Sequence, residues 1–146
     1  TGAKLAGEMS GHIFFNDRWY GFDDALYSAA RLLEILSREE QTVDAVFDAL
    51  PNSVSTPEIK IHVPDSEKFQ FMQQFIQQAY FEAGKTNTID GLRVDFPNGW
   101  GLVRPSNTTP CLVLRFEADD EATLQHIQNL FSQELLKIDS NLEIPF

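Results

Sequence analysis

The sequence predicts an α+β protein whose C-terminal part is an antiparallel sheet of four to five strands with two helices on one face. Short runs of alternating apolar and polar residues recur after residue 57, which is the pattern of half-buried strands. Two longer stretches with apolar residues every three or four positions predict the helices. The dipeptides Asp90-Gly91 and Asn98-Gly99 are two-residue hairpin signals that join consecutive strands.

The composition is that of a folded, acidic protein. Of the 146 residues, 42% are hydrophobic, and 22 Asp and Glu against 11 Lys and Arg give a formal charge of −11. Because this charge repels polyphosphates and anionic lipid surfaces, we expect neither nucleic acid nor a membrane as a partner. The single cysteine, Cys111, excludes a disulfide framework and is expected to be a buried, inert thiol. We expect a cytoplasmic monomer with neither a membrane span nor a signal peptide.

The first 52 residues are expected to be the C-terminal tail of a larger α/β domain. Two short extended runs, at residues 4–6 and 12–15, precede a helix that Asp23 or Asp24 would cap. The apolar stripe of this helix is Ala25, Leu26, Ala29, Leu32, Leu33 and Leu36. Thr42 is expected to cap a second, shorter helix. Because these elements bury too little apolar surface for an independent core, we expect the sequence to begin inside a longer chain.

Residues 51–57 are rich in Pro, Asn, Ser and Thr and are predicted to be a linker, which places a domain boundary between residues 1–52 and 53–146. Beyond the linker we expect strands at residues 58–63, 85–89, 92–96, 100–104 and 111–118, and helices at residues 65–83 and 119–138. The first of these helices is expected to bury Phe69, Met72, Ile76, Ala79 and Tyr80. The open face of the sheet is expected to carry charges of both signs, on Lys60, His62, Arg93, Asp95, Arg115 and Glu117. This arrangement is TATA-box-binding-protein-like.

The connection between the last two expected strands has the composition of an anion-binding turn. The segment Arg104-Pro105-Ser106-Asn107-Thr108-Thr109-Pro110 combines one guanidinium with short hydroxyl and amide side chains between two prolines. Arg104 offers a planar fork of donors that matches phosphate oxygens. The four residues from Ser106 to Thr109 can direct side-chain and backbone donors toward the same point. The alternative interpretation is a polar hairpin loop that binds nothing.

A second segment, Gly7-Glu8-Met9-Ser10-Gly11-His12, brings a carboxylate, a hydroxyl and an imidazole together on a glycine-bounded loop. A carboxylate acceptor beside a hydroxyl suits the vicinal hydroxyls of a sugar, because each hydroxyl both donates and accepts hydrogen bonds. Taken alone, a loop glutamate is more often solvated and a lone histidine is more often structural. The segment by itself therefore leaves a purely structural interpretation open.

Together the two segments resemble a known family. Gly-Glu-Met-Ser-Gly-His at residues 7–12 and Gly-Trp-Gly-Leu-Val-Arg-Pro-Ser-Asn-Thr-Thr-Pro at residues 99–110 resemble the C-terminal part of the α-D-phosphohexomutases, in particular the bacterial phosphomannomutase/phosphoglucomutase branch. The similarity extends through Arg18-Trp19-Tyr20-Gly21-Phe22-Asp23-Asp24 and the closing Pro145-Phe146. Met9 is similar to the mannose/glucose branch, since the glucosamine-phosphate branch usually has Gln at this position.

The resemblance implies a four-domain enzyme, of which residues 1–52 are the end of domain 3 and residues 53–146 are domain 4. It implies that domain 3 contacts the sugar, through Glu8, Ser10 and His12, with His12 also a candidate for proton transfer. It implies that domain 4 binds the phosphate group that is not being transferred, through Arg104, Ser106, Asn107, Thr108 and Thr109. The implied ligands are the 1- and 6-phosphates of glucose and mannose and their 1,6-bisphosphates. The other implied partner is the missing N-terminal part of domains 1–3.

In this family an enzyme phosphoserine phosphorylates the sugar, a bisphosphate intermediate forms, and the sugar reorients before its other phosphate returns to the enzyme. The 146 residues contain neither a Ser-His-Asn-Pro-type nucleophile loop nor an Asp-x-Asp-x-Asp metal loop. Asp23 and Asp24 are interpreted as helix caps rather than as ligands of Mg²⁺, which the resemblance places outside this chain. The chain alone is expected to be inactive and to hold no metal.

Two alternatives differ from this hypothesis. In the first, the sheet and its helices form a non-catalytic interaction module for protein or nucleic acid, and the Ser/Asn/Thr turn is incidental. A sheet that binds nucleic acid should be basic, which the expected mixed charges disfavour. In the second, the chain belongs to the glucosamine-phosphate mutase branch, which differs in its sugar contacts.

Overall fold

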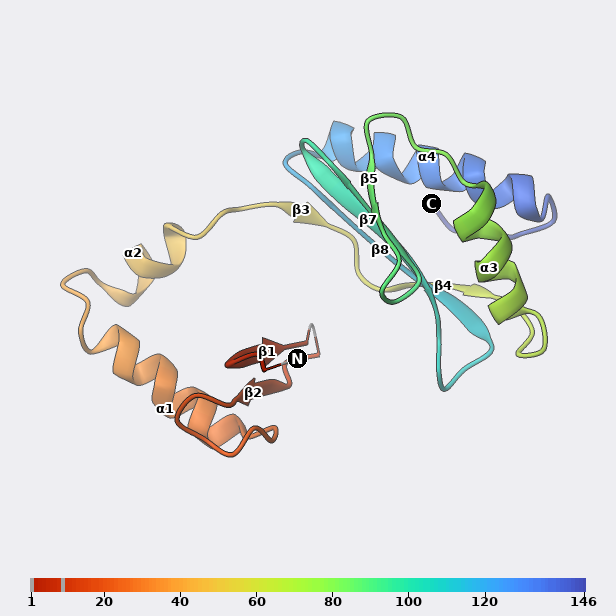
Figure 1. The fold of residues 1–146 in the computed structure, drawn as a ribbon. Coiled ribbons are helices and arrows are strands. Elements are labelled where there is room, and N and C mark those ends of the chain that lie inside the picture. The colour runs from red at the N-terminus through yellow and green to blue at the C-terminus, as the bar shows by residue number, and fades with distance from the viewer. Residues whose placement is uncertain (1, 9) are drawn as a thin grey trace. The chain divides into compact units, whose positions relative to one another are not determined.

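The first unit of the chain is held together by local contacts. The computed structural model describes residues 2–8 and 10–146, and it divides into unit 1, Thr1–Pro51, and unit 2, Asn52–Phe146 (Figure 1). Thr1 and Met9 lie outside the described residues, and so does the interpretation of Met9 as a mark of the mannose/glucose branch. In unit 1, strands β1 (Leu5–Gly7) and β2 (Ile13–Phe15) pair antiparallel and are followed by helices α1 (Ala25–Leu36) and α2 (Val43–Asp48).

Both helices of unit 1 begin at the residues that the sequence predicts. The Asp24 carboxylate accepts a hydrogen bond from the Tyr27 amide, and the Thr42 hydroxyl accepts one from the Ala45 amide, so each satisfies an otherwise unpaired backbone donor. Most apolar residues of α1 are nevertheless exposed, with Leu26 85% exposed, and Leu36 is only partly buried. Order in unit 1 therefore rests on caps, strand pairing and surface clusters rather than on a buried core.

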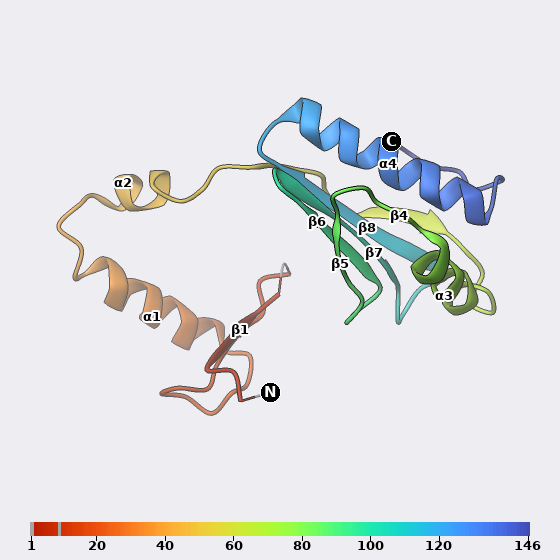
Figure 2. The same cartoon turned by 45° about the horizontal axis from the view of Figure 1, so that its top comes forward.

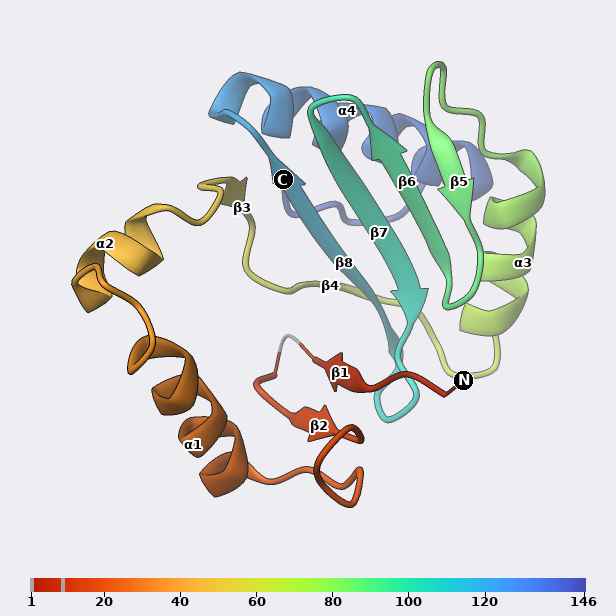
Figure 3. The same ribbon diagram turned by 60° about the vertical axis from the view of Figure 1, so that its left-hand side comes forward.

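Unit 2 is a six-stranded antiparallel sheet, one strand larger than the widest sheet that the sequence predicts. Its strands are β3 (Val54–Ser55), β4 (Ile59–His62), β5 (Lys85–Asn87), β6 (Leu92–Phe96), β7 (Gly99–Pro105) and β8 (Cys111–Ala118). The strand order is β3-β8-β7-β6-β5, and β4 also pairs with β8 (Figure 3). The additional strand, β3, lies in the segment predicted to be a linker.

The length of β8 explains the additional strand. β8 has eight residues, and β7 pairs with residues 112–118 along one of its edges. On the other edge β4 pairs with residues 111–114 and β3 pairs with residues 117–118, so two short strands share one side of β8. An unpaired strand edge leaves backbone donors and acceptors without partners, and β3 supplies partners at the end that β4 does not reach.

Helices α3 (Lys68–Gln78) and α4 (Glu121–Ile138) cover one face of the sheet, as the sequence predicts (Figure 2). The core between the helices and the sheet contains Ile61, Phe75, Val94, Val103, Leu112, Leu114, Phe116, Ile127, Phe131 and Leu135. Alternate strand residues therefore face the helices, and the charged residues between them lie on the open face. Among the described residues, no helix has the length and apolarity needed to cross a lipid bilayer.

Helix α3 differs from its prediction in length and in buried face. It ends at Gln78 rather than near residue 83, and the chain then turns back to bury Phe81. The helix buries Lys68, Phe71, Met72 and Phe75. Phe69 and Tyr80, which were predicted to be buried, are 57% and 74% exposed. Ile76 is also exposed, at 37%, whereas Met72 is buried as predicted. The predicted stripe was therefore wrong in part, because α3 has apolar residues on two adjacent stripes and only packing against the sheet selects between them.

Phe131 of α4 is the centre of the aromatic core. Its ring lies within 6.4 Å of the ring centroids of Phe75, Phe81 and Phe116. Gly101 of β7 permits this packing, because a Cβ atom there would lie 2.4 Å from the Phe131 ring. The glycine thus lets α4 approach β7, the strand that leads into the predicted anion-binding turn.

Replacing Phe131 by alanine is expected to lower the free energy of unfolding by about 3–5 kcal/mol, because it removes ring contacts and leaves a cavity. Denaturant unfolding followed by circular dichroism would measure this change. Leu136→Ala on the same helix is the matched control, because Leu136 is 37% exposed, and it should cost at most about 1 kcal/mol. Equal losses in the two variants would contradict the central position of Phe131.

Candidate functional site

The turn between β7 and β8 presents the residues predicted to bind an anion. Arg104 and Pro105 are the last two residues of β7, and Arg104 pairs with Val113 across the hairpin. The side chains of Asn107 and Thr108 are exposed at the tip of the turn. β7 and β8 are the longest strands of the sheet, so the turn is carried by the most extensively paired hairpin of unit 2.

Ser106 and Thr109 hold the turn in shape through their side chains. The buried Ser106 hydroxyl accepts hydrogen bonds from the Thr108 amide at 3.3 Å and the Thr109 amide at 3.1 Å. It also lies 2.7 Å from the Thr109 hydroxyl, which in turn lies 3.1 Å from the Cys111 sulfur. With two amides occupying its lone pairs, the Ser106 hydroxyl is left as the donor to Thr109. An incoming anion would therefore meet Arg104, Asn107 and Thr108 before it meets Ser106.

Arg104 is the charged residue of this turn that is predicted to bind an anion. Within the part of the chain that the structure describes, the ion pairs involve other residues and leave Arg104 outside them. Its backbone is supported by Gly91, where an added Cβ would lie 2.6 Å from the Arg104 Cα and 2.1 Å from the Val103 oxygen. Gly91 also has a φ of +75°, which a side chain would strain. The hairpin turn at Gly91 thus fixes the strand end that carries the guanidinium.

In unit 1, the predicted sugar-binding residues lie on the β1–β2 turn. The Ser10 hydroxyl donates to the Glu8 carboxylate at 3.0 Å, so the two groups are already adjacent. The Glu8 amide donates to the His12 carbonyl and the Gly11 amide to the Glu8 carbonyl, which closes the turn. Gly11 has a φ of +89°, a conformation that suits glycine. The carboxylate and hydroxyl thus form an exposed polar pair that can exchange its internal bond for sugar hydroxyls.

His12 is oriented by a residue that the sequence analysis assigned to a different role. The Asp23 carboxylate lies 2.6 Å from His12 Nδ1 and also accepts the Ile13 amide at 3.1 Å. Asp24, its neighbour, provides the cap of α1. Of the two aspartates predicted as possible helix caps, Asp24 caps α1 and Asp23 does not. With Nδ1 engaged, Nε2 is the ring nitrogen left to exchange a proton with a ligand.

The contact between His12 and Asp23 shifts the pKa values of both side chains. The hydrogen bond from Asp23, followed by the charge of Asp23, raises the pKa of His12 above its ordinary value. The hydrogen bond to His12, followed by that from the Ile13 amide, lowers the pKa of Asp23. Because the pKa of His12 is raised, its pairing stabilises the folded state at pH values below the unfolded-state pKa of His12. This stabilisation is lost as the pH rises through the raised folded-state pKa. Because the pKa of Asp23 is lowered, its pairing stabilises the folded state at pH values above the unfolded-state pKa of Asp23. This stabilisation is lost as the pH falls through the lowered folded-state pKa.

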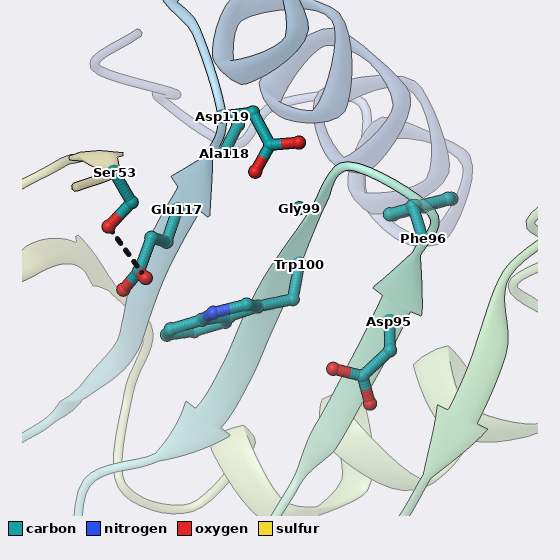
Figure 4. A pocket seen from close by; sticks show the side chains of 8 residues that line it. All are labelled: Ser53, Asp95, Phe96, Gly99, Trp100, Glu117, Ala118 and Asp119. Atoms are coloured by element: carbon teal, nitrogen blue, oxygen red, sulfur yellow. Dashed lines mark hydrogen bonds between the residues drawn. The ribbon is translucent and has the colours of Figure 1, made fainter. Parts of the chain in front are cut away.

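A shallow cleft of about 220 Å³ lies at the opposite end of the β7–β8 hairpin (Figure 4). It is lined by Ser53, Asp95, Phe96, Gly99, Trp100, Glu117, Ala118 and Asp119. The Ser53 hydroxyl donates to Glu117 at 2.8 Å, as Figure 4 shows. Three carboxylates would repel a phosphate group, so we do not assign phosphate binding to this cleft. Among residues 2–8 and 10–146, no three His, Cys, Asp or Glu side chains are grouped so that they could hold a metal ion.

Comparison with known proteins identifies the family. The model of the phosphoglucomutase/phosphomannomutase C-terminal domain matches residues 58–133, and that of the phosphoglucomutase/phosphomannomutase alpha/beta/alpha domain III matches residues 1–54. The chain belongs to the phosphoglucomutase/phosphomannomutase family. Both turns described above lie within the matched segments.

Curated members of this family are similar to the chain over all or most of its length. A phosphomannomutase/phosphoglucomutase of Pseudomonas putida is 58% identical over 100% of the chain and 32% of that relative. A phosphoglucomutase of Neisseria gonorrhoeae is 57% identical over 90% of the chain and 29% of that relative. The crystal structure of a phosphoglucomutase/phosphomannomutase family protein from Burkholderia thailandensis has a TM-score of 0.89 and 50% identity, covering 100% of this chain and 31% of the other. The chain thus spans about a third of the length of its relatives.

Replacing Asp23 by asparagine is expected to lower the pKa of His12, because the hydrogen bond to a charged acceptor and the negative charge are both removed. An NMR titration of the His12 ring protons would measure the change, with the two other histidines as internal references. Asp24→Asn is the matched control, since asparagine caps a helix as well as aspartate does, and it should leave the His12 pKa near its original value. The same pKa in Asp23→Asn as in the unsubstituted chain would exclude the pairing.

Proposed function

We propose that this chain is the sugar- and phosphate-binding portion of a phosphomannomutase/phosphoglucomutase, an enzyme that interconverts hexose 1-phosphates and 6-phosphates. The observation that carries the proposal is the end of β7, where Arg104 stands outside the ion pairs of the described residues beside an exposed amide and hydroxyl. In a chain with a formal charge of −11, such a local cation and its neighbouring donors favour one compact anion over a polyanion. The names of the relatives support a hexose phosphate as that anion.

Each unit carries its own set of proposed ligand contacts. In unit 2, Arg104, Asn107 and Thr108 would bind the phosphate group that is not being transferred, while Ser106 and Thr109 shape the turn around it. In unit 1, Glu8 and Ser10 would bind the sugar hydroxyls, because a carboxylate accepts from a hydroxyl to which a serine can donate. His12, oriented by Asp23, would exchange a proton with the sugar oxygen through Nε2.

The proposed mechanism requires binding in two orientations. An enzyme phosphoserine would phosphorylate the free end of the sugar, giving a 1,6-bisphosphate, and the reoriented intermediate would return its other phosphate to the enzyme. The donors would hold the distal phosphate and the hydroxyls in either orientation of the sugar. They would thereby position the reacting end of the sugar without contacting it. We place the phosphoserine and its Mg²⁺ outside this chain, because its sequence lacks both corresponding loops, and we propose that the chain alone is inactive.

Replacing Arg104 by alanine in the complete mutase is expected to raise KM for a hexose 1-phosphate by about 10- to 100-fold with a smaller change in kcat, because a charge-assisted contact to a distal phosphate supplies binding and orientation. Steady-state kinetics would measure both constants. Arg93→Ala is the matched control: Arg93 lies on the same face of the sheet, bonds Asp95 and covers the Trp100 ring at 4.0 Å. Similar KM values for the Arg104 variant and the unsubstituted enzyme would refute phosphate binding at this turn.

A further inference from the structure

A buried lysine lies against the phosphate-binding turn. Lys68, the first residue of α3, has a side chain that is only 4% exposed. Burying an ammonium group costs free energy unless hydrogen bonds and an opposite charge replace its water. Here Nζ donates to the Asp65 carboxylate at 2.6 Å and to the Thr109 carbonyl at 3.0 Å. The second contact joins the start of a helix to the turn 41 residues later.

The same segment braces the turn at a second point. The Val63 amide donates to the Pro110 carbonyl at 3.1 Å, so residues 63 and 68 hold consecutive carbonyls of the turn. The Thr109 carbonyl also accepts the Cys111 amide at 2.9 Å. Two donors, one of them charged, therefore fix the direction of this single peptide group.

The direction of the Thr109 carbonyl matters because its peptide unit ends in Pro110, which has no N–H. This unit can offer an anion only the negative end of its dipole. A carbonyl that turned toward a phosphate would repel it, whereas one bonded to Lys68 is held on the inner side of the turn. The neighbouring amide and hydroxyl donors can then face the ligand without an opposing dipole.

We propose that Lys68 is a positioning residue for phosphate recognition: its buried ammonium holds the Thr109 carbonyl inside the turn and so sets the donor geometry around the phosphate. The inference rests on the proposed function of the turn. It adds a residue from a different element, which does not itself contact the ligand. It also explains why a charged side chain occupies a buried position on α3.

The test uses the 146-residue chain, labelled with ¹⁵N and titrated with inorganic phosphate, with the amides of Asn107 and Thr108 as reporters. Lys68→Met, which fills similar space without donors, is expected to shift these amides before phosphate is added and to raise the dissociation constant about tenfold. Lys68→Gln keeps a hydrogen-bond donor but not the charge, and it should raise the dissociation constant about threefold. If Lys68→Met does not fold, Lys68→Gln provides the test instead. In the complete mutase, Lys68→Met should raise KM and leave kcat within about twofold.

Lys137→Met is the matched control. Lys137 also bonds a carboxylate three residues earlier, Glu134, but its side chain is 63% exposed. It should leave phosphate binding unchanged. If Lys68→Met folds and binds phosphate as tightly as the unsubstituted chain while Arg104→Ala loses binding, the positioning role is refuted and the proposed function stands. If Arg104→Ala leaves the KM of the complete mutase unchanged, the proposed function fails, and the inference fails with it.

Discussion

Unit 2 depends on the pairing of β8 along both of its edges. One edge fixes the register of β7 and therefore the position of Arg104, which stands opposite Val113. The other edge holds β4, whose continuation leads to Val63 and Lys68, the two residues that bond the carbonyls of the proposed phosphate-binding turn. The strand order thus brings a helix start, a strand end and a turn together, although they are far apart in the sequence. Because both ladders share β8, a disturbance of β8 would affect both the core and the candidate site.

The charge distribution is compatible with the proposed anion site in an acidic chain. On the open face Arg93 pairs with Asp95 and Lys60 with Glu58, whereas Arg115 has no ion pair among the described residues. The cleft at the far end of the hairpin is lined by carboxylates. Arg104 and the buried Lys68 are concentrated at one turn instead. At the ionic strength of a cell, charges more than about 8 Å apart are largely screened at the surface, so the local set decides what binds there. A single phosphate group matches this set, whereas an extended polyanion would meet the surrounding negative charge.

The sequence predicted the strands of unit 2 well because alternation and the two glycine hairpins reflect local physics. It missed β3, since a two-residue strand arises only where the edge of β8 is unoccupied. It chose the wrong stripe of α3, because Phe69 and Phe71 are equally apolar and packing decides between them. It predicted Asp23 as a cap, although the strand register brings that carboxylate to His12. Lys68 was missed because a lysine near a helix start is usually solvated; Asp65 three residues earlier was the available signal.

The position of Cys111 gives the turn a built-in chemical reporter. Its sulfur is shielded by the protein and lies against the Thr109 hydroxyl, so a thiol-directed alkylating reagent can reach it only when the turn opens. The rate of covalent labelling therefore measures the frequency of local opening at the place where a ligand would settle. Any compound that closes the turn would protect the sulfur, which permits ligand screening on an unmodified chain without a catalytic assay.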